Sequence, residues 1–328
     1  MSLITQQVIF VDKVSKINGC LQNQRRFVVS SLNEKTDSKT TNKQVQNVIQ
    51  GVRTSDGAGV KLTRIIGSQQ LQMLDPFLLL DCFESDDPND YIAGFPPHPH
   101  RGFEPITFLI EGEQLHRDSL GNESVVKAGD VQWTTAGRGI IHAEAPTKDF
   151  VKKGGTLEGI QLWLNLPADK KMIAANYQHV KHEDFRIVTS EDTKVETRII
   201  AGELNTTYGR IATQTKVNAF LIDAKAGGFE KISFPDSHQG LVYLLKGKVN
   251  VNALEVLEFN KNQLIQFNQD GDAITIEAES DSLLLFLSGE PFNEKVKTYG
   301  PYVMNTQTEI MEALRDYQMG KMGFLTAN

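Results

Sequence analysis

The stretch His98-Pro-His-Arg-Gly-Phe-Glu-Pro-Ile-Thr-Phe-Leu-Ile-Glu-Gly112 contains a short β-branched and aromatic run that ends at a glycine turn. Similar runs recur from about residue 48 onward, separated by Gly, Asp and Asn. They are Ile106–Ile110, Gly129–Trp133, Ile160–Leu164, Ala219–Ile222, Leu241–Leu245 and Leu283–Leu287. Many short strands joined by turns are typical of β-sandwiches and barrels. The sequence therefore predicts an all-β fold.

The strand that ends at Gly112 has a weak counterpart in the second half of the chain. Phe108-Leu-Ile-Glu-Gly112 is followed by a stretch ending in Ala128-Gly-Asp-Val-Gln132, and Tyr243-Leu-Leu-Lys-Gly247 by one containing Lys261–Phe267. In both copies a strand ends at a glycine, and further strands follow at similar spacing. Such a repeat indicates a duplicated structural unit. We therefore predict two β-barrels rather than one long barrel.

The two ends of the chain differ from the strand-rich part. Residues 33–46 are nearly all polar, and no aromatic residue occurs between positions 28 and 76, which predicts a flexible N-terminal extension over residues 1–47. Near the other end, Thr306 and Glu309 form a capping box, and Ile310, Leu314 and Tyr317 follow at helical spacing. We therefore predict a first barrel over residues 48–185 and a second over 186–328, closed by an amphipathic helix.

Composition excludes several classes of protein. The 328 residues are 40% apolar and 23% charged, which is ordinary for a soluble globular chain. The net charge of −7 argues against direct binding of nucleic acid. The run Leu283–Leu287 is far shorter than the roughly 20 apolar residues of a membrane span. With only Cys20 and Cys82 and no secretory signal, the chain is expected in a reducing compartment, the cytoplasm.

Residues of strong metal-ligand type fall in two short pairs, His98-Pro-His100 and His142-Ala-Glu144. On a strand, residues i and i+2 point to the same face about 6.6 Å apart, so each pair can offer two ligands to one ion. Three neutral imidazoles and a carboxylate suit Fe(II), Ni, Cu(II), Zn or Mn. The alternative is a set of unrelated histidines with a solvated glutamate. Two pairs beside strand-like runs favour the metal site over that alternative.

Neighbouring residues allow both functional and structural interpretations. We read His116 as lacking a ligand partner two residues away, which predicts a solvated or loop position. Glu104 is expected to bond with Arg101 or Arg138 rather than to act as a ligand or base. Four aromatic residues are expected in the core, with the lining of a pocket as the alternative: Phe95, Phe103, Phe108 and Trp133. Two short basic pairs are expected on solvated faces: Lys152–Lys153 and Lys170–Lys171.

Several stretches closely resemble the pirin family, and the likeness runs from about Gly57 to Phe324. They are Asp75-Pro-Phe-Leu-Leu-Leu-Asp81, His98-Pro-His-Arg-Gly-Phe-Glu104, Gln132-Trp-Thr-Thr-Ala-Gly-Arg-Gly-Ile-Ile-His-Ala-Glu144 and Gly300-Pro-Tyr-Val-Met-Asn-Thr306. The resemblance implies a bicupin, in which two antiparallel β-barrels face each other and only the first binds a metal. The family's ligands fall on His98, His100, His142 and Glu144. The implied ion is Fe(II), with Ni, Cu, Mn, Zn and Co as alternatives.

The second barrel is expected to lack a ligand set. When Gly247 is aligned with Gly112, Ser233, Pro235 and Gln239 take the places of His98, His100 and Glu104. The one histidine between residues 186 and 328 is His238, which cannot hold an ion alone.

The resemblance implies one of two functions. The first is a dioxygenase that opens the central ring of quercetin or a related flavonol with O2 and releases carbon monoxide. The flavonol would bind at the metal, which would lower the pKa of its 3-hydroxyl group. Glu144 would then be a catalytic residue as well as a ligand, loosening to accept the phenolic proton.

The second function is a redox-sensing iron protein that co-regulates transcription through a protein partner. In a eukaryote, it would occur in the nucleus as well as the cytoplasm. A metal-storing or structural cupin is a third possibility, since fold does not determine function. Access to the metal separates the first two functions, because catalysis needs a site open to a planar flavonoid. A monomer is expected in each case.

Overall fold

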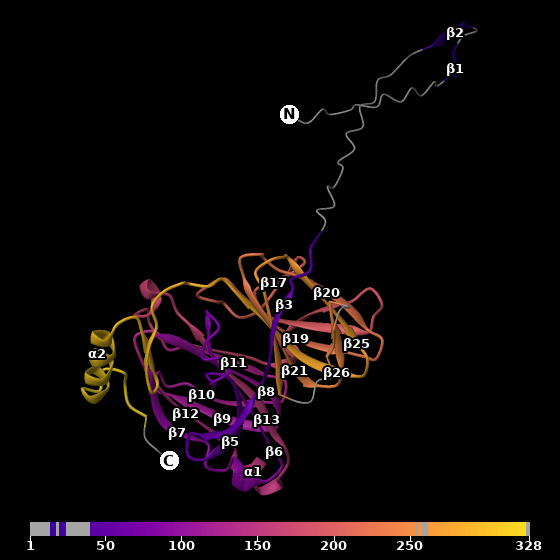
Figure 1. Cartoon of the computed structure of the whole chain (residues 1–328). Coiled ribbons are helices and arrows are strands. Elements are labelled where there is room, and N and C mark those ends of the chain that lie inside the picture. Colours follow the sequence, from indigo (N-terminus) through magenta and orange to yellow (C-terminus); the bar gives the residue numbers. More distant parts are fainter. Residues whose placement is uncertain (1–13, 18–19, 24–39, 253–254, 258–261, 326–328) are drawn as a thin grey trace. The chain divides into compact units, whose positions relative to one another are not determined.

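The computed structural model describes residues 14–17, 20–23, 40–252, 255–257 and 262–325. The chain divides into two compact units, residues 1–39 and residues 40–328. In the first unit, β1 (Val14–Ile17) pairs antiparallel with β2 (Cys20–Asn23). Most of the predicted N-terminal extension lies outside the described residues. The second unit contains two barrels, in indigo to magenta and in orange in Figure 1.

The first barrel consists of a seven-stranded and a four-stranded antiparallel sheet, with strand orders β14-β11-β8-β13-β6-β5-β4 and β10-β9-β12-β7. The strands are β4 (Val52–Asp56), β5 (Val60–Ile66), β6 (Phe77–Ser85), β7 (Phe95–His100), β8 (Phe103–Glu111), β9 (Glu113–Asp118), β10 (Glu123–Lys127), β11 (Val131–Thr135), β12 (Ile140–Pro146), β13 (Leu157–Asn165) and β14 (Asn176–Val180). The short helices are η1 (Pro88–Asp90), α1 (Lys148–Lys153), η2 (Ala168–Lys170) and η3 (His182–Asp184).

The second barrel repeats this arrangement strand for strand, with sheet orders β3-β24-β21-β26-β19-β16-β15 and β23-β22-β25-β20. Its strands are β3 (Val45–Gln50), β15 (Arg186–Thr189), β16 (Val195–Ala201), β19 (Val217–Ala224), β20 (Phe229–Ser233), β21 (Gln239–Lys246), β22 (Val249–Val251), β23 (Glu255–Leu257), β24 (Gln263–Phe267), β25 (Ala273–Ala278) and β26 (Ser282–Gly289). A separate hairpin joins β17 (Glu203–Leu204) to β18 (Thr207–Tyr208). The predicted duplication is thus a duplication of sheet topology.

The two seven-stranded sheets share one hydrophobic core. Ile106, Phe108 and Trp133 of the first barrel belong to the same buried cluster as Leu241 and Tyr243 of the second. Side chains alternate between the two faces of a strand, so every second residue of β8 or β21 faces the other barrel. The shared core therefore holds the barrels face to face, and each barrel keeps its other face for its own interior.

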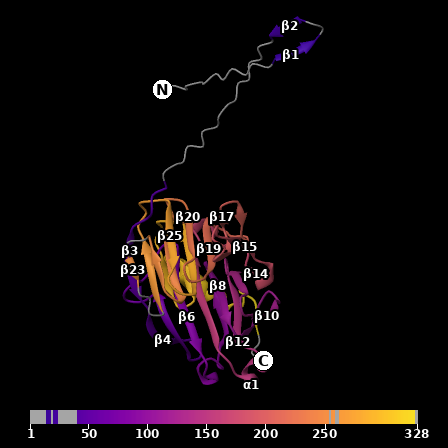
Figure 2. The ribbon, with the colours of Figure 1, turned by 90° about the vertical axis from the view of Figure 1, so that its right-hand side faces the viewer.

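Residues 40–47, the end of the predicted extension, form part of the second barrel. β3 pairs with β24 and takes the place that β14 has in the first barrel; Figure 2 shows its indigo ribbon beside the orange strands. Lys43 is fully buried, donates from Nζ to the Asp236 carbonyl (2.9 Å) and lies over the Phe234 ring. Composition gave no sign of this, because the stabilising partners are far away in the chain.

The C-terminal segment returns to the first barrel. Strands β27 (Lys297–Tyr299) and β28 (Tyr302–Met304) form a hairpin, and α2 (Gln307–Gln318) follows with the predicted Thr306–Glu309 capping box. Ile310 of α2 packs in a buried cluster with Tyr302 and with Ile141 of β12. The predicted all-β bicupin closed by a C-terminal helix is therefore confirmed. Among the described residues, no helix combines the length and apolar character needed to cross a membrane.

Candidate metal centre

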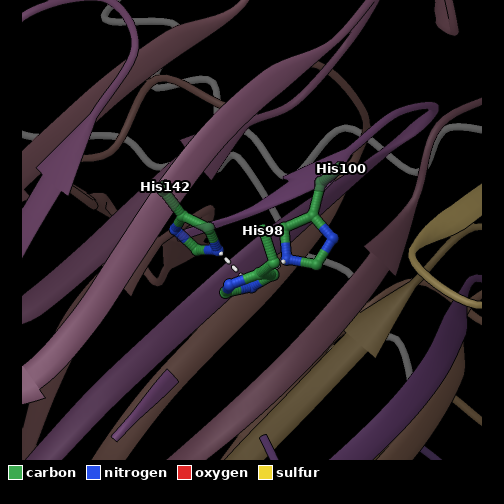
Figure 3. Close-up of side chains that lie close together, drawn as sticks. All are labelled: His98, His100 and His142. Atoms are coloured by element: carbon green, nitrogen blue, oxygen red, sulfur yellow. Dashed lines mark hydrogen bonds between the residues drawn. The ribbon is translucent and has the colours of Figure 1, made fainter. Parts of the chain in front are cut away.

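The pairing of β7 with β12 brings two predicted ligand pairs together. His142 lies opposite His98, and Ile140 lies opposite His100, in the register of these antiparallel strands. Nε2 of His98 is 3.0 Å from Nε2 of His100 and 3.0 Å from Nε2 of His142, as Figure 3 shows. The three imidazoles therefore converge on one point inside the first barrel.

The outer ring nitrogens determine which atoms are free to bind a cation. Nδ1 of His98 lies 2.8 Å from the Pro96 carbonyl and Nδ1 of His100 lies 3.4 Å from the Pro301 carbonyl. Because a carbonyl only accepts, these Nδ1 atoms carry the protons, and the Nε2 lone pairs face the centre. Burial, and then the neighbouring His98, holds the pKa of His100 well below its ordinary value. Burial likewise lowers the pKa of His142. Imidazole lone pairs that converge in this way fit a divalent ion.

Glu144 is buried beside this cluster but is held by neutral side chains. Its Oε1 accepts from the Thr107 hydroxyl (3.3 Å) and from the Gln132 amide, and its Oε2 accepts from the Gln161 amide (3.4 Å). Two sets of potential donors have all their ligand atoms within 4.8 Å of one another: His98, His100 and His142, and His116, His142 and Glu144. The four predicted ligands thus lie in two overlapping groups that share His142.

The expectation for His116 was wrong. It is fully buried on β9, opposite Glu144 of β12, and its ring stacks on Tyr177 at 4.1 Å between centroids. Its Nε2 lies 3.3 Å from Asp118 Oδ2. The missed signal is His116-Arg-Asp118, an i, i+2 pair whose two side chains share the inner face of a strand. The interior of the first barrel therefore has a third polar pair beside the two that were predicted.

The expectation for Glu104 was also wrong. It lies on the face of β8 that packs toward the second barrel, and it accepts a hydrogen bond from the Thr135 hydroxyl (2.6 Å) rather than from an arginine. Burial raises its pKa to about 7. Because Thr107 faces the centre and Glu104 is an odd number of residues away, strand alternation directs Glu104 to the opposite face. Glu104 therefore does not belong to the metal centre.

A cavity of about 900 Å³ opens onto the histidine cluster. His98 and His100 line it together with Phe95, Gln161 and Trp163. The C-terminal segment supplies another part of the wall, from Val296 to Val303. A volume of this size is within the range of small-molecule sites. Phe95 thus lines a pocket, whereas Phe103, Phe108 and Trp133 are fully buried, as expected for core residues.

A buried lysine ties the C-terminal segment to the site. Lys171, which was expected on a solvated face, is buried and donates from Nζ to the Gly102 carbonyl (2.7 Å), Asn165 Oδ1 (2.7 Å) and the Val303 carbonyl (3.1 Å). Burial lowers the pKa of Lys171 to about 8. Gly102 has a φ of +90°, and a Cβ there would lie 1.9 Å from the Val303 carbonyl oxygen. The backbone beside His100 therefore requires glycine.

The fold and the site together define a two-barrel cupin with a candidate metal centre in its first barrel. The family model for pirin matches residues 59–164, and the model for the pirin C-terminal cupin domain matches residues 220–323. The chain belongs to the pirin family, which confirms the prediction from its motifs.

Relatives and solved structures extend this result over most of the chain. A pirin-like protein of Caulobacter vibrioides is 40% identical over 280 residues, which are 84% of this chain and 98% of that protein. Pirin of Mus musculus is 34% identical over 273 residues, 82% of this chain and 90% of that protein. The crystal structure of a quercetin 2,3-dioxygenase from Acinetobacter baumannii matches with a TM-score of 0.80 and 34% identity, over 87% of this chain and all of that one.

Proposed function

We propose that the chain is a metal-dependent dioxygenase that opens the central ring of a flavonol such as quercetin with O2. The observation that carries the proposal is the convergence of three imidazole Nε2 atoms at one end of a cavity of about 900 Å³. A sensor that works through its surface does not need such an open space at the ion. The name of the Acinetobacter relative supports the same reaction class.

His98, His100 and His142 would hold one divalent ion, and Glu144 would join them as the fourth ligand. Fe(II) is the first candidate, and Ni, Cu, Mn, Zn and Co are alternatives, because imidazole binds all of these borderline ions. The bound ion would polarise the 3-hydroxyl and carbonyl groups of the flavonol and lower the pKa of the hydroxyl. The carbonyls of Pro96 and Pro301 would keep the rings of His98 and His100 oriented.

Glu144 is the proposed catalytic base. Its bonds to Thr107, Gln132 and Gln161 hold the carboxylate beside the centre when it is not a ligand. A carboxylate with such neutral donors can leave the ion, accept the phenolic proton and still have hydrogen-bond partners. Glu144→Gln is expected to lower turnover at least 100-fold. Full turnover with full metal content in this variant would rule out the role of Glu144 as base.

The cavity walls suit a planar aromatic substrate. Phe95 and Trp163 offer apolar ring surfaces, and the Gln161 amide adds a polar group close to the metal ligands. Aromatic pairs add about 0.5–1.5 kcal/mol beyond the area they bury. The substrate's reacting ring would therefore be held next to the imidazoles, with the rest of the molecule in the outer part of the cavity.

The test is anaerobic reconstitution with Fe(II), followed by flavonol absorbance and O2 uptake after quercetin is added. Wild type is expected to bind about one ion per chain and to consume quercetin, whereas His142→Ala loses both. His182→Ala, which removes an exposed histidine outside the site, is the matched control and should retain both.

One ion per chain without turnover, with Fe(II) and with each alternative metal, would overturn the enzyme proposal. That result would favour a redox-sensing co-regulator that binds a protein partner. Monomeric state and location in the cytoplasm, or in the nucleus and cytoplasm of a eukaryote, remain predictions for either function.

A further inference from the structure

The second barrel has a cavity beside the end of β16 and the start of β19, where the first barrel has the wall of the pocket that leads to its candidate metal centre. It measures about 650 Å³. Residues at matching positions of the two barrels line the two cavities. Gly202 follows β16 as Gly67 follows β5. Asn218 is the second residue of β19 as Leu78 is the second residue of β6. The end of β20 and the segment after it also line this cavity, through Ser233, Phe234, Pro235 and His238, and β20 corresponds to β7. The duplication has therefore kept a pocket without keeping the histidine cluster.

A buried hydrogen-bond chain ends at this cavity. Asn218 Oδ1 accepts from the Glu203 backbone N–H (3.0 Å), which orients the amide so that its Nδ2 donates to Ser288 Oγ (3.0 Å). Nδ1 of His238 lies 3.2 Å from the same hydroxyl oxygen. Ser288 is fully buried, Asn218 and His238 are more than nine-tenths buried, and Asn218 and His238 line the cavity. Three polar side chains are thus arranged in series toward the pocket.

This chain allows a tautomer of His238 in which Nδ1 accepts a hydrogen bond. Ser288 Oγ accepts from Asn218, so its own hydrogen is free to be donated, and Nδ1 of His238 is its remaining neighbour among the described residues. If Nδ1 accepts, the proton of the neutral ring is on Nε2. The structure gives Nε2 no partner within the described part of the chain. In that tautomer, His238 carries an unpaired N–H donor in the lining of the cavity.

The loop that carries His238 is held from several sides. Lys43 Nζ donates to the Asp236 carbonyl (2.9 Å), and the Gln269 amide donates to the Ser237 carbonyl (2.5 Å). The backbone N–H of His238 donates to the Pro235 carbonyl (3.1 Å). A donor on a fixed loop loses little conformational entropy when a ligand binds. The arrangement is therefore preorganised for an acceptor.

The residues that line the cavity indicate what kind of ligand would supply this hydrogen-bond acceptor. Phe234 and Tyr208 contribute aromatic rings, and Ile211 and Val217 contribute aliphatic surface. Lys216 is the one lysine or arginine among the described lining residues, and its ammonium is paired with Glu290 at 3.1 Å. A neutral ligand with an aromatic body matches these walls, and a carbonyl oxygen matches the His238 donor.

We propose that the second barrel binds a neutral aromatic ketone in this cavity, with its carbonyl oxygen accepting a hydrogen bond from Nε2 of His238. The site needs no metal ion and is independent of the function proposed for the first barrel. Burial also lowers the pKa of His238, which agrees with a neutral ring at pH 7.

Chromone is the probe for the test, because this bicyclic aromatic ketone has no hydroxyl group with which to chelate a metal. Titration calorimetry of the full chain, freed of metal by a chelator, is expected to show one site. His238→Ala should weaken binding about tenfold, the value of one hydrogen bond. His238→Gln, which keeps an amide donor, should recover part of the loss, and His142→Ala should bind like wild type.

Nitrogen-detected NMR of the histidine rings gives a second measurement. His238 is expected to carry its proton on Nε2 and to change its shift when chromone is added, with the thermal unfolding midpoint of each variant as the check on folding. Three results would each overturn the proposal: no binding up to millimolar chromone, equal binding by wild type and His238→Ala, or loss of binding in His142→Ala.

Discussion

The two barrels have the same strand order, but their interiors differ in polarity. In the first, β12 carries His142 opposite His98 of β7; in the second, the corresponding β25 carries Ile274 opposite Ile232 of β20. Ile232, rather than the predicted Ser233, therefore takes the place of His98. Of the four paired side chains, all except His98 are buried. One sheet topology therefore supports either a cluster of imidazoles or a hydrocarbon core, depending on the inward-facing residues.

The difference shows how the fold compensates the unfavourable free energy of burying polar side chains. Buried polar groups are unfavourable unless they have hydrogen-bond partners. The first barrel places His142, Glu144 and His116 in its interior, where each has a polar neighbour, and keeps a separate apolar cluster that includes Val60, Phe83 and Leu109. The second barrel has a continuous apolar interior that includes Phe220 and Phe286. We infer that the second barrel and the core shared by both sheets stabilise a chain whose first barrel buries a cluster of polar side chains.

The largest expected effect tests whether the second barrel stabilises the whole chain. Phe286 is fully buried, stacks on Phe220 and meets Phe234 edge-on. Phe286→Ala is expected to lower the free energy of unfolding by about 4 kcal/mol in a urea titration, because it leaves a cavity in that core. Phe229→Ala, at a half-exposed position, should cost less than about 0.5 kcal/mol. A loss below about 1 kcal/mol for Phe286→Ala would contradict the comparison.

The next prediction concerns Glu104 of the first barrel, whose counterpart in the second barrel is Gln239. Burial raises the pKa of Glu104 from its ordinary 4.5 to about 7. Between these pH values the unfolded chain releases the proton while the folded chain keeps it, so stability falls as pH rises and the loss is complete above pH 7.

Glu104→Gln removes this titration. The metal-free variant should match wild type near pH 4.5 and exceed its stability by about 3 kcal/mol at pH 8, measured by urea unfolding at both pH values. A difference between variant and wild type that does not change with pH would show that Glu104 is not perturbed by burial.

A reciprocal exchange tests the two interiors directly. Thr107 and Val242 each lie five residues before the glycine that ends their strand, and both are buried. Val242→Thr places an unpartnered hydroxyl in the apolar interior and should cost about 2 kcal/mol in thermal unfolding. Thr107→Val removes one donor to Glu144 and should cost about 1 kcal/mol or less. Equal costs would mean that the interiors do not differ in polarity as the comparison requires.

The smallest expected effect concerns the helix that closes the first barrel. Thr306 accepts from the Glu309 backbone N–H, and Glu309 accepts from the Thr306 backbone N–H (2.7 Å). Thr306→Ala should cost about 1 kcal/mol, while Thr306→Ser, which keeps the cap, should cost a few tenths. Equal unfolding midpoints for the alanine variant and wild type would show that packing of Ile310 alone holds α2.

The spacing of residue types along the sequence was sufficient to predict much of the fold and part of the candidate site. Strands such as Ile160–Leu164 and the capped helix at Thr306 are coded by neighbouring residues, because alternation and capping act over one to four positions. The pairs His98-Pro-His100 and His142-Ala-Glu144 were visible for the same reason. His116-Arg-Asp118 is the same kind of i, i+2 pair, so alternation also indicates that these two side chains share one face of a strand.

What the sequence determined by itself is the set of elements, the duplicated topology and the candidate metal ligands. Only the tertiary structure decided which side chains meet. It placed His116 beside Glu144 and Glu104 between the barrels, and it buried Lys43 and Lys171 against carbonyls from distant segments. Strand register and the return of the C-terminal segment set these contacts. The physical reason is that such contacts join residues tens to hundreds of positions apart, where no local pattern reports which partner will satisfy a buried polar group.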